Sequence, residues 1–217
     1  MKLYTFLGSP NGRKVEAVIN HLGLDIQIEY RDFFAGGLRT PDFVALNPNA
    51  MVPTLVDGSF ILWESNAIVQ YLADKADSEE LFPHDRQKRA DITRWQFWEA
   101  IHFNKAFGTL AVEAVAKPKY NLGETNHALV EAARADLARF APVLDRFLEG
   151  RRYLVDDRIT IADYAVIKLE SYRNSVPFDW SPFRNINNYF DRVAATDHWA
   201  RTAVQDPSTF GRKPKAA

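Results

Sequence analysis

The residues Ser9, Pro10 and Asn11 stand where a short strand-like pattern gives way to a helical one. Pro10 suits the first position of a helix, and Ser9 suits its N-cap. The free N–H groups at a helix start carry about half a positive charge, so this position stabilises anions. Hydroxyl and amide donors there would also favour the thiolate form of a bound thiol. The turn therefore predicts an anion or thiolate site, or more simply a plain helix cap.

A second candidate is the pair Val52-Pro53, just before the strand pattern that begins at Thr54. Proline is well tolerated at the first residue of a strand. With a cis bond, the Val52 N–H and C=O would face outward and could pair with an extended peptide ligand. The alternative is a trans proline that only begins the strand.

The third candidate is Glu64-Ser65-Asn66, at the start of another helical pattern. Ser65 can offer its hydroxyl and N–H to a ligand carboxylate, and Glu64 can meet an ammonium group. An exposed cap without a ligand is the alternative interpretation.

The elements that must position these residues form a short mixed pattern. Alternating apolar residues predict strands, and apolar residues at helical spacing predict helices. The Asp57-Gly58 pair predicts a hairpin. The expected order is βαβ followed by ββα, with the first two strands parallel. The predicted elements are a strand at 2–7, a helix at 10–22, a strand at 26–30, strands at 54–56 and 60–62, and a helix at 64–75.

Beyond this pattern the chain changes character. The charged stretch 77–87 reads as a linker. Thr160 and Asp163 have the spacing of a capping box, so we expect them to be structural residues that fix a helix start. Four helices are predicted after the linker, at 88–116, 124–149, 160–175 and 182–195.

Composition narrows the function classes. The 217 residues carry a formal net charge of -1, which gives no bulk electrostatic reason to expect nucleic acid or an anionic membrane as partner. The chain has no cysteine, so any thiol chemistry must use a sulfur supplied by the ligand. No histidine pair has metal-ligand spacing, and we expect no metal. No signal peptide or apolar run of about 18 residues is seen, so we expect a cytoplasmic protein.

Taken in order, these motifs resemble those of the cytosolic glutathione transferases, and the resemblance covers nearly the whole chain. The active-site turn is similar to that of the serine-type enzymes and to the bacterial nu-like branch. The matching segments are Ser9-Pro10-Asn11-Gly12-Arg13-Lys14-Val15, Asn47-Pro48-Asn49-Ala50-Met51-Val52-Pro53-Thr54-Leu55, Glu64-Ser65-Asn66-Ala67-Ile68 and Ile161-Ala162-Asp163.

The resemblance implies a role for each matching residue. Ser9 and Asn11 would donate hydrogen bonds to the thiolate of glutathione, the co-substrate. The Val52 backbone, before a cis Pro53, would pair with the cysteinyl part. Glu64 and Ser65 would hold the γ-glutamyl end. Arg39 would meet the glycyl carboxylate. Met51 is also expected among the glutathione-binding residues, at a position where many relatives use Lys or Gln.

The resemblance also implies the architecture. A thioredoxin-like α/β domain with a mixed four-stranded sheet would occupy residues 1–76. An all-helical domain would occupy 88–217 and contribute the hydrophobic substrate site, with Phe103, Phe107 and Leu110 as candidates. The alternative is that these three side chains are core or dimer-interface residues.

The implied activity is attack of the thiolate on small hydrophobic electrophiles by a homodimeric enzyme. Glutathione-dependent disulfide reduction is an alternative, since members of the nu-like branch reduce disulfides. A non-catalytic glutathione-binding protein is a second alternative.

Overall fold

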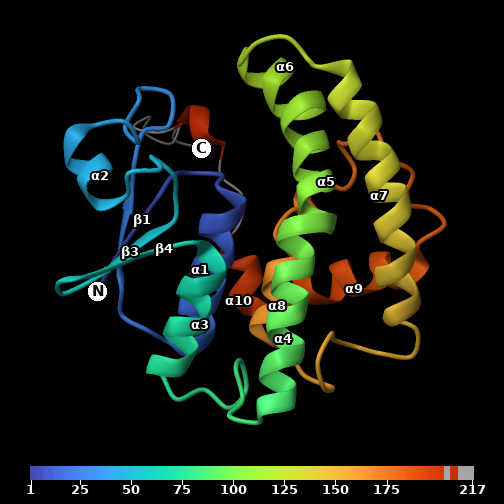
Figure 1. Cartoon of the computed structure of the whole chain (residues 1–217), viewed down its shortest axis with the longest axis horizontal. Helices are drawn as coiled ribbons and strands as arrows, with labels where there is room; N and C mark the ends of the chain where they lie inside the picture. The colour runs from blue at the N-terminus through green and yellow to red at the C-terminus, as the bar shows by residue number, and fades with distance from the viewer. Residues whose placement is uncertain (203–205, 210–217) are drawn as a thin grey trace, which may run out of the picture. The chain divides into compact units, whose positions relative to one another are not determined.

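The computed structural model describes residues 1–202 and 206–209. The chain divides into two compact units, one built from Met1–Ala76 with the chain end from Arg201, the other from Asp77–Ala200. The predicted second domain, 88–217, therefore runs past this division, and its residues 203–205 and 210–217 lie outside the described residues. The helices and strands of both units are labelled in Figure 1.

The first unit contains a mixed sheet of four strands in the order β2-β1-β3-β4. β1 and β2 are parallel, with Lys2 opposite Gln27. β3 runs antiparallel to both of its neighbours, and β3 and β4 form the predicted hairpin. The expected mixed sheet is confirmed. The strands are β1 (Lys2–Thr5), β2 (Gln27–Tyr30), β3 (Thr54–Asp57) and β4 (Phe60–Trp63).

Three helices complete this unit: α1 (Pro10–Leu22), α2 (Pro41–Leu46) and α3 (Ser65–Lys75). Helices α1 and α3 pack side by side (Figure 1). Gly23 ends α1 in a left-handed conformation at φ 62°, which glycine adopts without steric cost. Burial of apolar side chains from both the sheet and the helices forms the core. Its fully buried members include Leu3, Val15, Leu55, Ile68 and Leu72. The order βαβ–ββα is that of a thioredoxin-like domain, as expected.

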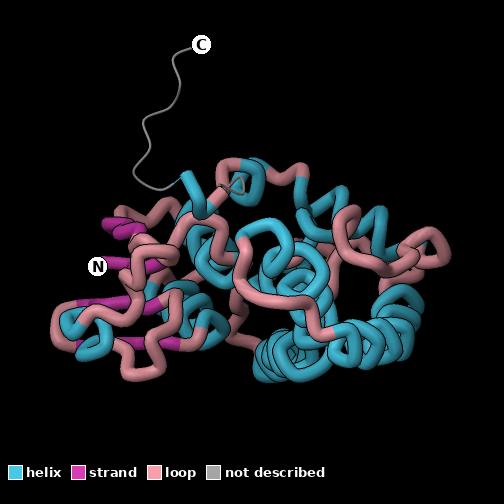
Figure 2. The backbone as a smooth tube through the Cα atoms, turned by 90° about the horizontal axis from the view of Figure 1, so that it is seen from above, coloured by secondary structure: helices cyan, strands magenta, loops and turns pink. Residues whose placement is uncertain are grey.

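Residues 77–200, all of which the structure describes, form helices and loops only (Figure 2). The stretch expected as a linker contributes to this unit, because Leu81 and Phe82 are buried and the Leu81 carbonyl accepts from the Ile161 N–H at 3.1 Å. The helices are α4 (Arg86–Trp98), α5 (Asn104–Leu110), α6 (Lys117–Tyr120), α7 (His127–Phe147), α8 (Ile161–Ile167), α9 (Arg184–Ala194) and α10 (Asp197–Ala200).

Two π-helical segments, Glu99–Phe103 and Ala111–Ala116, interrupt the run that begins with α4. The helical run predicted at 88–116 is present, but it is not α-helical throughout. Apolar spacing reports which face is buried, and it does not report an i→i+5 hydrogen bond.

The helix predicted at 160–175 is shorter, since α8 ends at Ile167 and a separate 3-10 turn spans Glu170–Tyr172. The carbonyls of Ala165 and Val166 accept hydrogen bonds from Asn104 Nδ2 at 3.0 and 3.2 Å. Asn104 thus satisfies carbonyl groups that the last turn of α8 leaves open.

The predicted capping box is confirmed at the start of α8. Asp163 Oδ2 accepts from the Thr160 N–H at 2.7 Å, and Thr160 Oγ1 accepts from the Ala162 N–H at 3.3 Å. Asp163 Oδ1 also accepts from the Leu154 N–H and the Tyr189 hydroxyl. Burial raises the pKa of Asp163 to about 6 against these hydrogen bonds, which lower it.

Candidate active site

Ser9 is the N-cap of α1 and is 95% buried, with 5% of its surface exposed. Its Oγ accepts a hydrogen bond from the Gly12 N–H at 3.1 Å. Because Oγ accepts in this bond, the hydroxyl keeps its own proton for a bond to a ligand. The Ser9 carbonyl begins the helix by accepting from the Arg13 N–H at 2.8 Å. The cap and a donor role are therefore compatible in one side chain.

The starts of α1 and α3 are joined by their side chains. Ser65 Oγ donates to Asn11 Oδ1 at 3.3 Å. This bond occupies the acceptor end of the Asn11 amide and leaves its Nδ2 as a donor. Two helix N-termini thus meet at one place, and the positive ends of their dipoles favour an anionic ligand.

A pocket of about 70 Å³ lies at this junction. It brings together six of the predicted site residues: Asn11, Met51, Val52, Pro53, Glu64 and Ser65. Three further lining residues were not predicted as site residues: Asn47, Asn49 and Trp63. Asn47 and Asn49 belong to the segment 47–55 that resembles the family motif, so the sequence did contain a signal for them. The half-exposed Trp63 at the end of β4 carried no signal beyond its aromatic type.

The loop before β3 is organised by Asn47, which is almost fully buried. Its Nδ2 donates to the Met51 carbonyl at 2.9 Å and to Thr54 Oγ1 at 3.1 Å. The Val52–Pro53 peptide bond is cis, as the resemblance implied. Among the described residues, no hydrogen bond involves Val52, so its N–H and C=O are open to a ligand.

Glu64 precedes α3 with a backbone conformation of φ 70° and ψ 108°. A positive φ is costly for a residue with a Cβ, and such positions concentrate at binding sites. The Glu64 side chain is exposed, so its carboxylate can meet a cationic group of a ligand.

Lys14 is a buried cation beneath this junction, with none of its surface exposed. Its Nζ donates to Asn66 Oδ1 at 2.6 Å, which makes a second side-chain link between α1 and α3. Lys14 belongs to the motif at residues 9–15, but no role was predicted for it. The signal was its position on the apolar face of α1, between the buried residues Gly12 and Val15.

Other predicted site residues lie elsewhere. Ser9 does not line the 70 Å³ pocket, although it shares the turn with Asn11. Arg39 lies exposed in the turn before α2, where its N–H donates to the Gly36 carbonyl at 2.8 Å, and it does not line the pocket either.

Phe103, Phe107 and Leu110 are fully buried in the helical unit. Phe103 stacks on Trp98 with ring centroids 5.4 Å apart, and Phe107 contacts Trp180 at 5.1 Å. These contacts agree with the alternative in which the aromatic side chains are core residues.

The arrangement offers hydroxyl, amide and backbone donors for anionic groups, an extended backbone segment for a peptide, and a carboxylate for an ammonium group. No cluster of three or more possible metal ligands occurs within residues 1–202 and 206–209. In the same ranges, no helix has the length and apolar character needed to cross a bilayer.

Comparison with known proteins identifies the family of the chain. Residues 1–74 match the model described as glutathione S-transferase, N-terminal domain, and residues 102–197 match the corresponding C-terminal domain. The chain is 32% identical to glutathione S-transferase 3 of Zea mays over 212 residues, which cover 95% of both proteins. It is 30% identical to glutathione S-transferase D7 of Drosophila melanogaster, covering 100% of this chain and 96% of the relative.

A solved structure supports the same assignment. The theta-class glutathione S-transferase of Xanthomonas axonopodis pv. citri, solved with glutathione bound, superimposes with a TM-score of 0.84 at 28% identity. The match covers 95% of this chain and 98% of that protein. With the mixed sheet, the helical second unit and both family models in agreement, this chain belongs to the glutathione S-transferase family.

Proposed function

We propose that the turn at Ser9 activates the thiol of glutathione for attack on small hydrophobic electrophiles. The observation that carries the proposal is the Ser9 Oγ atom, which accepts from the Gly12 N–H and therefore keeps its proton to donate to a thiolate. Ser9 stays protonated throughout, so it stabilises the thiolate and does not act as a base.

Such a site can supply the free energy needed to lower the pKa of the glutathione thiol. Lowering a thiol pKa by two units corresponds to about 2.7 kcal/mol. One hydrogen bond to a charged group is worth about 1.5–3 kcal/mol, and the start of α1 adds a further favourable dipole. Asn11 Nδ2 supplies a second donor on the same turn. This arrangement corresponds to a serine-type site with a turn similar to that of the nu-like branch.

The rest of glutathione is assigned to the pocket at the junction of α1 and α3. The Val52 backbone pairs with the cysteinyl part, next to Pro53 and Met51. Ser65 and the start of α3 hold the γ-glutamyl carboxylate, and Glu64 meets its ammonium group. Arg39 takes the glycyl carboxylate, which is an anionic group that Met51 cannot bind.

The domain roles follow from this assignment. Residues 1–76 bind glutathione, 77–87 connect the two parts, and 88–217 contribute the site for the hydrophobic substrate. We place the enzyme in the cytoplasm as a homodimer. The side chains of Phe97 and Ile101, 63% and 55% exposed on the helical run, provide apolar surface for a partner.

The decisive experiment is a titration of bound glutathione followed by the ultraviolet absorbance of its thiolate. Ser9→Ala is expected to raise the thiol pKa by about 1–2 pH units, because one charged hydrogen bond is lost. Ser78→Ala, which removes a cap bonded to the Leu81 N–H in the helical unit, is the matched control. An unchanged thiol pKa in Ser9→Ala would assign the thiolate to Asn11 or to backbone N–H groups.

Activity assays complete the test. Turnover of a chloronitroarene is expected for conjugation, whereas turnover of hydroxyethyl disulfide alone would identify a disulfide reductase. Retained glutathione binding with neither activity would contradict the catalytic proposal.

A further inference from the structure

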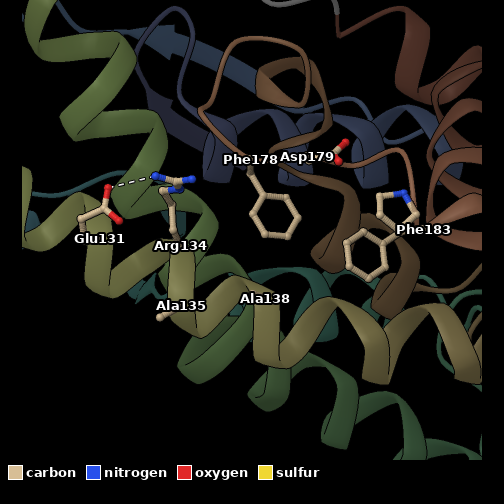
Figure 3. Close-up of a pocket in the computed structure, with 8 residues that line it drawn as sticks. Glu131, Arg134, Ala135, Ala138, Phe178, Asp179 and Phe183 are labelled. Carbon is tan, nitrogen blue, oxygen red and sulfur yellow. Dashed lines mark hydrogen bonds and ion pairs between the residues drawn. The ribbon is translucent and has the colours of Figure 1, made fainter.

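A pocket of about 470 Å³ opens on the second unit, and its whole lining comes from residues 131–183. This volume is within the usual range of small-molecule sites, roughly 300–1,000 Å³. None of the predicted glutathione-binding residues lines it. Its walls come from α7 and from the loop before α9 (Figure 3).

The α7 wall is one face of the helix. Glu131, Arg134, Ala135 and Ala138 follow one another at spacings of three, one and three residues, which places them on neighbouring turns of the same side. The two alanines project only methyl groups, so the middle of this wall is open. Glu131 and Arg134 form an ion pair at 3.0 Å beside it (Figure 3).

The opposite wall is aromatic. The rings of Phe178 and Phe183 are nearly parallel, with 11° between their planes and 5.8 Å between their centroids. Phe178 rests edge-on against Trp180 at 4.7 Å, and Trp180 is buried against Phe107. Because this wall is backed by the core, its shape is set before any ligand arrives.

The charge of the pocket is negative by one unit. The charges of Glu131 and Arg134 offset each other in their ion pair. Asp179 accepts from the Ser181 N–H at 2.9 Å, and the hydrogen bonds from Ser181 hold the pKa of its carboxyl below the ordinary value. Within residues 1–202 and 206–209, no cationic side chain pairs with Asp179.

We propose that this pocket binds a small planar aromatic molecule carrying one positive charge. The ring system packs between the alanine face of α7 and the rings of Phe178 and Phe183. The cationic group lies toward Asp179, where the aromatic faces add a favourable cation–π interaction. The site is separate from the thiolate chemistry at Ser9 and does not depend on it.

The test is calorimetric titration of the full chain with 1-naphthylmethylammonium and with 1-naphthoate, which share a ring system and differ in charge. S-methylglutathione is kept at saturation so that the glutathione site is filled. We expect one cation bound per chain, with an affinity higher than that of naphthoate. Asp179→Asn is expected to weaken cation binding by about fivefold, as for one charge a few ångströms away in a partly hydrated site. Asp136→Asn, which removes an exposed charge of α7 outside the pocket, is the matched control.

A second variant tests the location. Ala138→Trp fills the pocket from an exposed position and is expected to abolish binding of the cation while the circular dichroism spectrum is unchanged. Tighter binding of naphthoate, equal loss in Asp136→Asn and Asp179→Asn, or retained binding in Ala138→Trp would each overturn the proposal. One further outcome would overturn it. If the native chain binds no cation and Ala138→Trp changes the sedimentation mass, this face contacts a second copy of the chain.

Discussion

The hydroxyl of Thr5 lies directly against Gly12. A Cβ built on Gly12 would fall 2.0 Å from Thr5 Oγ1 and 3.2 Å from the Ser9 Cβ. Thr5 is fully buried at the end of β1, and within the described residues its Oγ1 has no hydrogen-bond partner. Glycine at position 12 therefore lets the first turn of α1 approach the strand closely enough for the Gly12 N–H to hold Ser9 Oγ.

This contact predicts that Gly12→Ala impairs both stability and catalysis. The added methyl group must displace the first turn of α1, at a cost of about 1–3 kcal/mol in the free energy of unfolding. Ser9 moves with that turn, so the pKa of the thiol of bound glutathione is expected to rise and kcat/KM to fall. Urea unfolding and the thiolate titration measure the two effects.

A second substitution makes the Gly12 prediction specific. Thr5→Ala removes Oγ1 and is expected to restore part of the loss in the Gly12→Ala background. Thr5→Val keeps a branched side chain of similar size and is expected to restore nothing. Equal behaviour of the two double variants would contradict a steric origin.

Two substitutions of Glu64 distinguish its proposed role in glutathione binding from the strain of its backbone conformation. Glu64→Ala and Glu64→Gly both remove the carboxylate assigned to the ligand ammonium, so each is expected to weaken glutathione binding by about tenfold. Only glycine relaxes the positive φ at this position, and Glu64→Gly should be more stable than Glu64→Ala by about 1 kcal/mol. Calorimetry gives the affinity and thermal unfolding the stability. A glutathione analogue without the amino group should bind all three proteins equally.

Asp163 predicts a pH dependence of stability in the acidic range. Its pKa is raised from 3.8 to about 6 in the folded protein, so the folded state keeps the proton to a higher pH than the unfolded state. The contribution of this group to the free energy of unfolding therefore falls by about 3 kcal/mol as the pH rises from 4 to above 6. Asp163→Asn is expected to abolish that slope in urea unfolding, and Asp136→Asn to preserve it.

Asp163→Asn should also be less stable than the native chain at pH 4, where ionisation of Asp163 has not yet destabilised the native chain. An amide has one acceptor atom where the carboxylate has two, so at least one buried donor among the Leu154 N–H, the Thr160 N–H and the Tyr189 hydroxyl loses its partner. A native-like stability would contradict the structural role of the capping box.

Much of the first unit could be predicted because its signals are local. Ser9 caps α1, Gly23 ends it, and Asp57-Gly58 turns the hairpin, each through the conformation of a few adjacent residues. The same locality identified the capping box at Thr160. These signals need no knowledge of tertiary contacts.

The features that escaped prediction depend on contacts between distant residues. The early end of α8 involves Asn104, which lies about sixty residues before the carbonyls that it binds. The full burial of Phe103 and Phe107 depends in part on Trp180, which follows them by more than seventy residues. Apolar type alone cannot distinguish a side chain that lines a cavity from one that fills the core.

Two side-chain hydrogen bonds, from Lys14 to Asn66 and from Ser65 to Asn11, together hold the starts of α1 and α3 at a fixed spacing. They fix the span between the turn at Ser9 and the backbone at Glu64, the residue before α3. A peptide held at both ends must match that span, so a β-aspartyl analogue of glutathione, one methylene shorter, could place either its amino end or its sulfur correctly, but not both. With the roles proposed for Ser9 and Glu64, the packing of the two helices would select thiol substrates by their length.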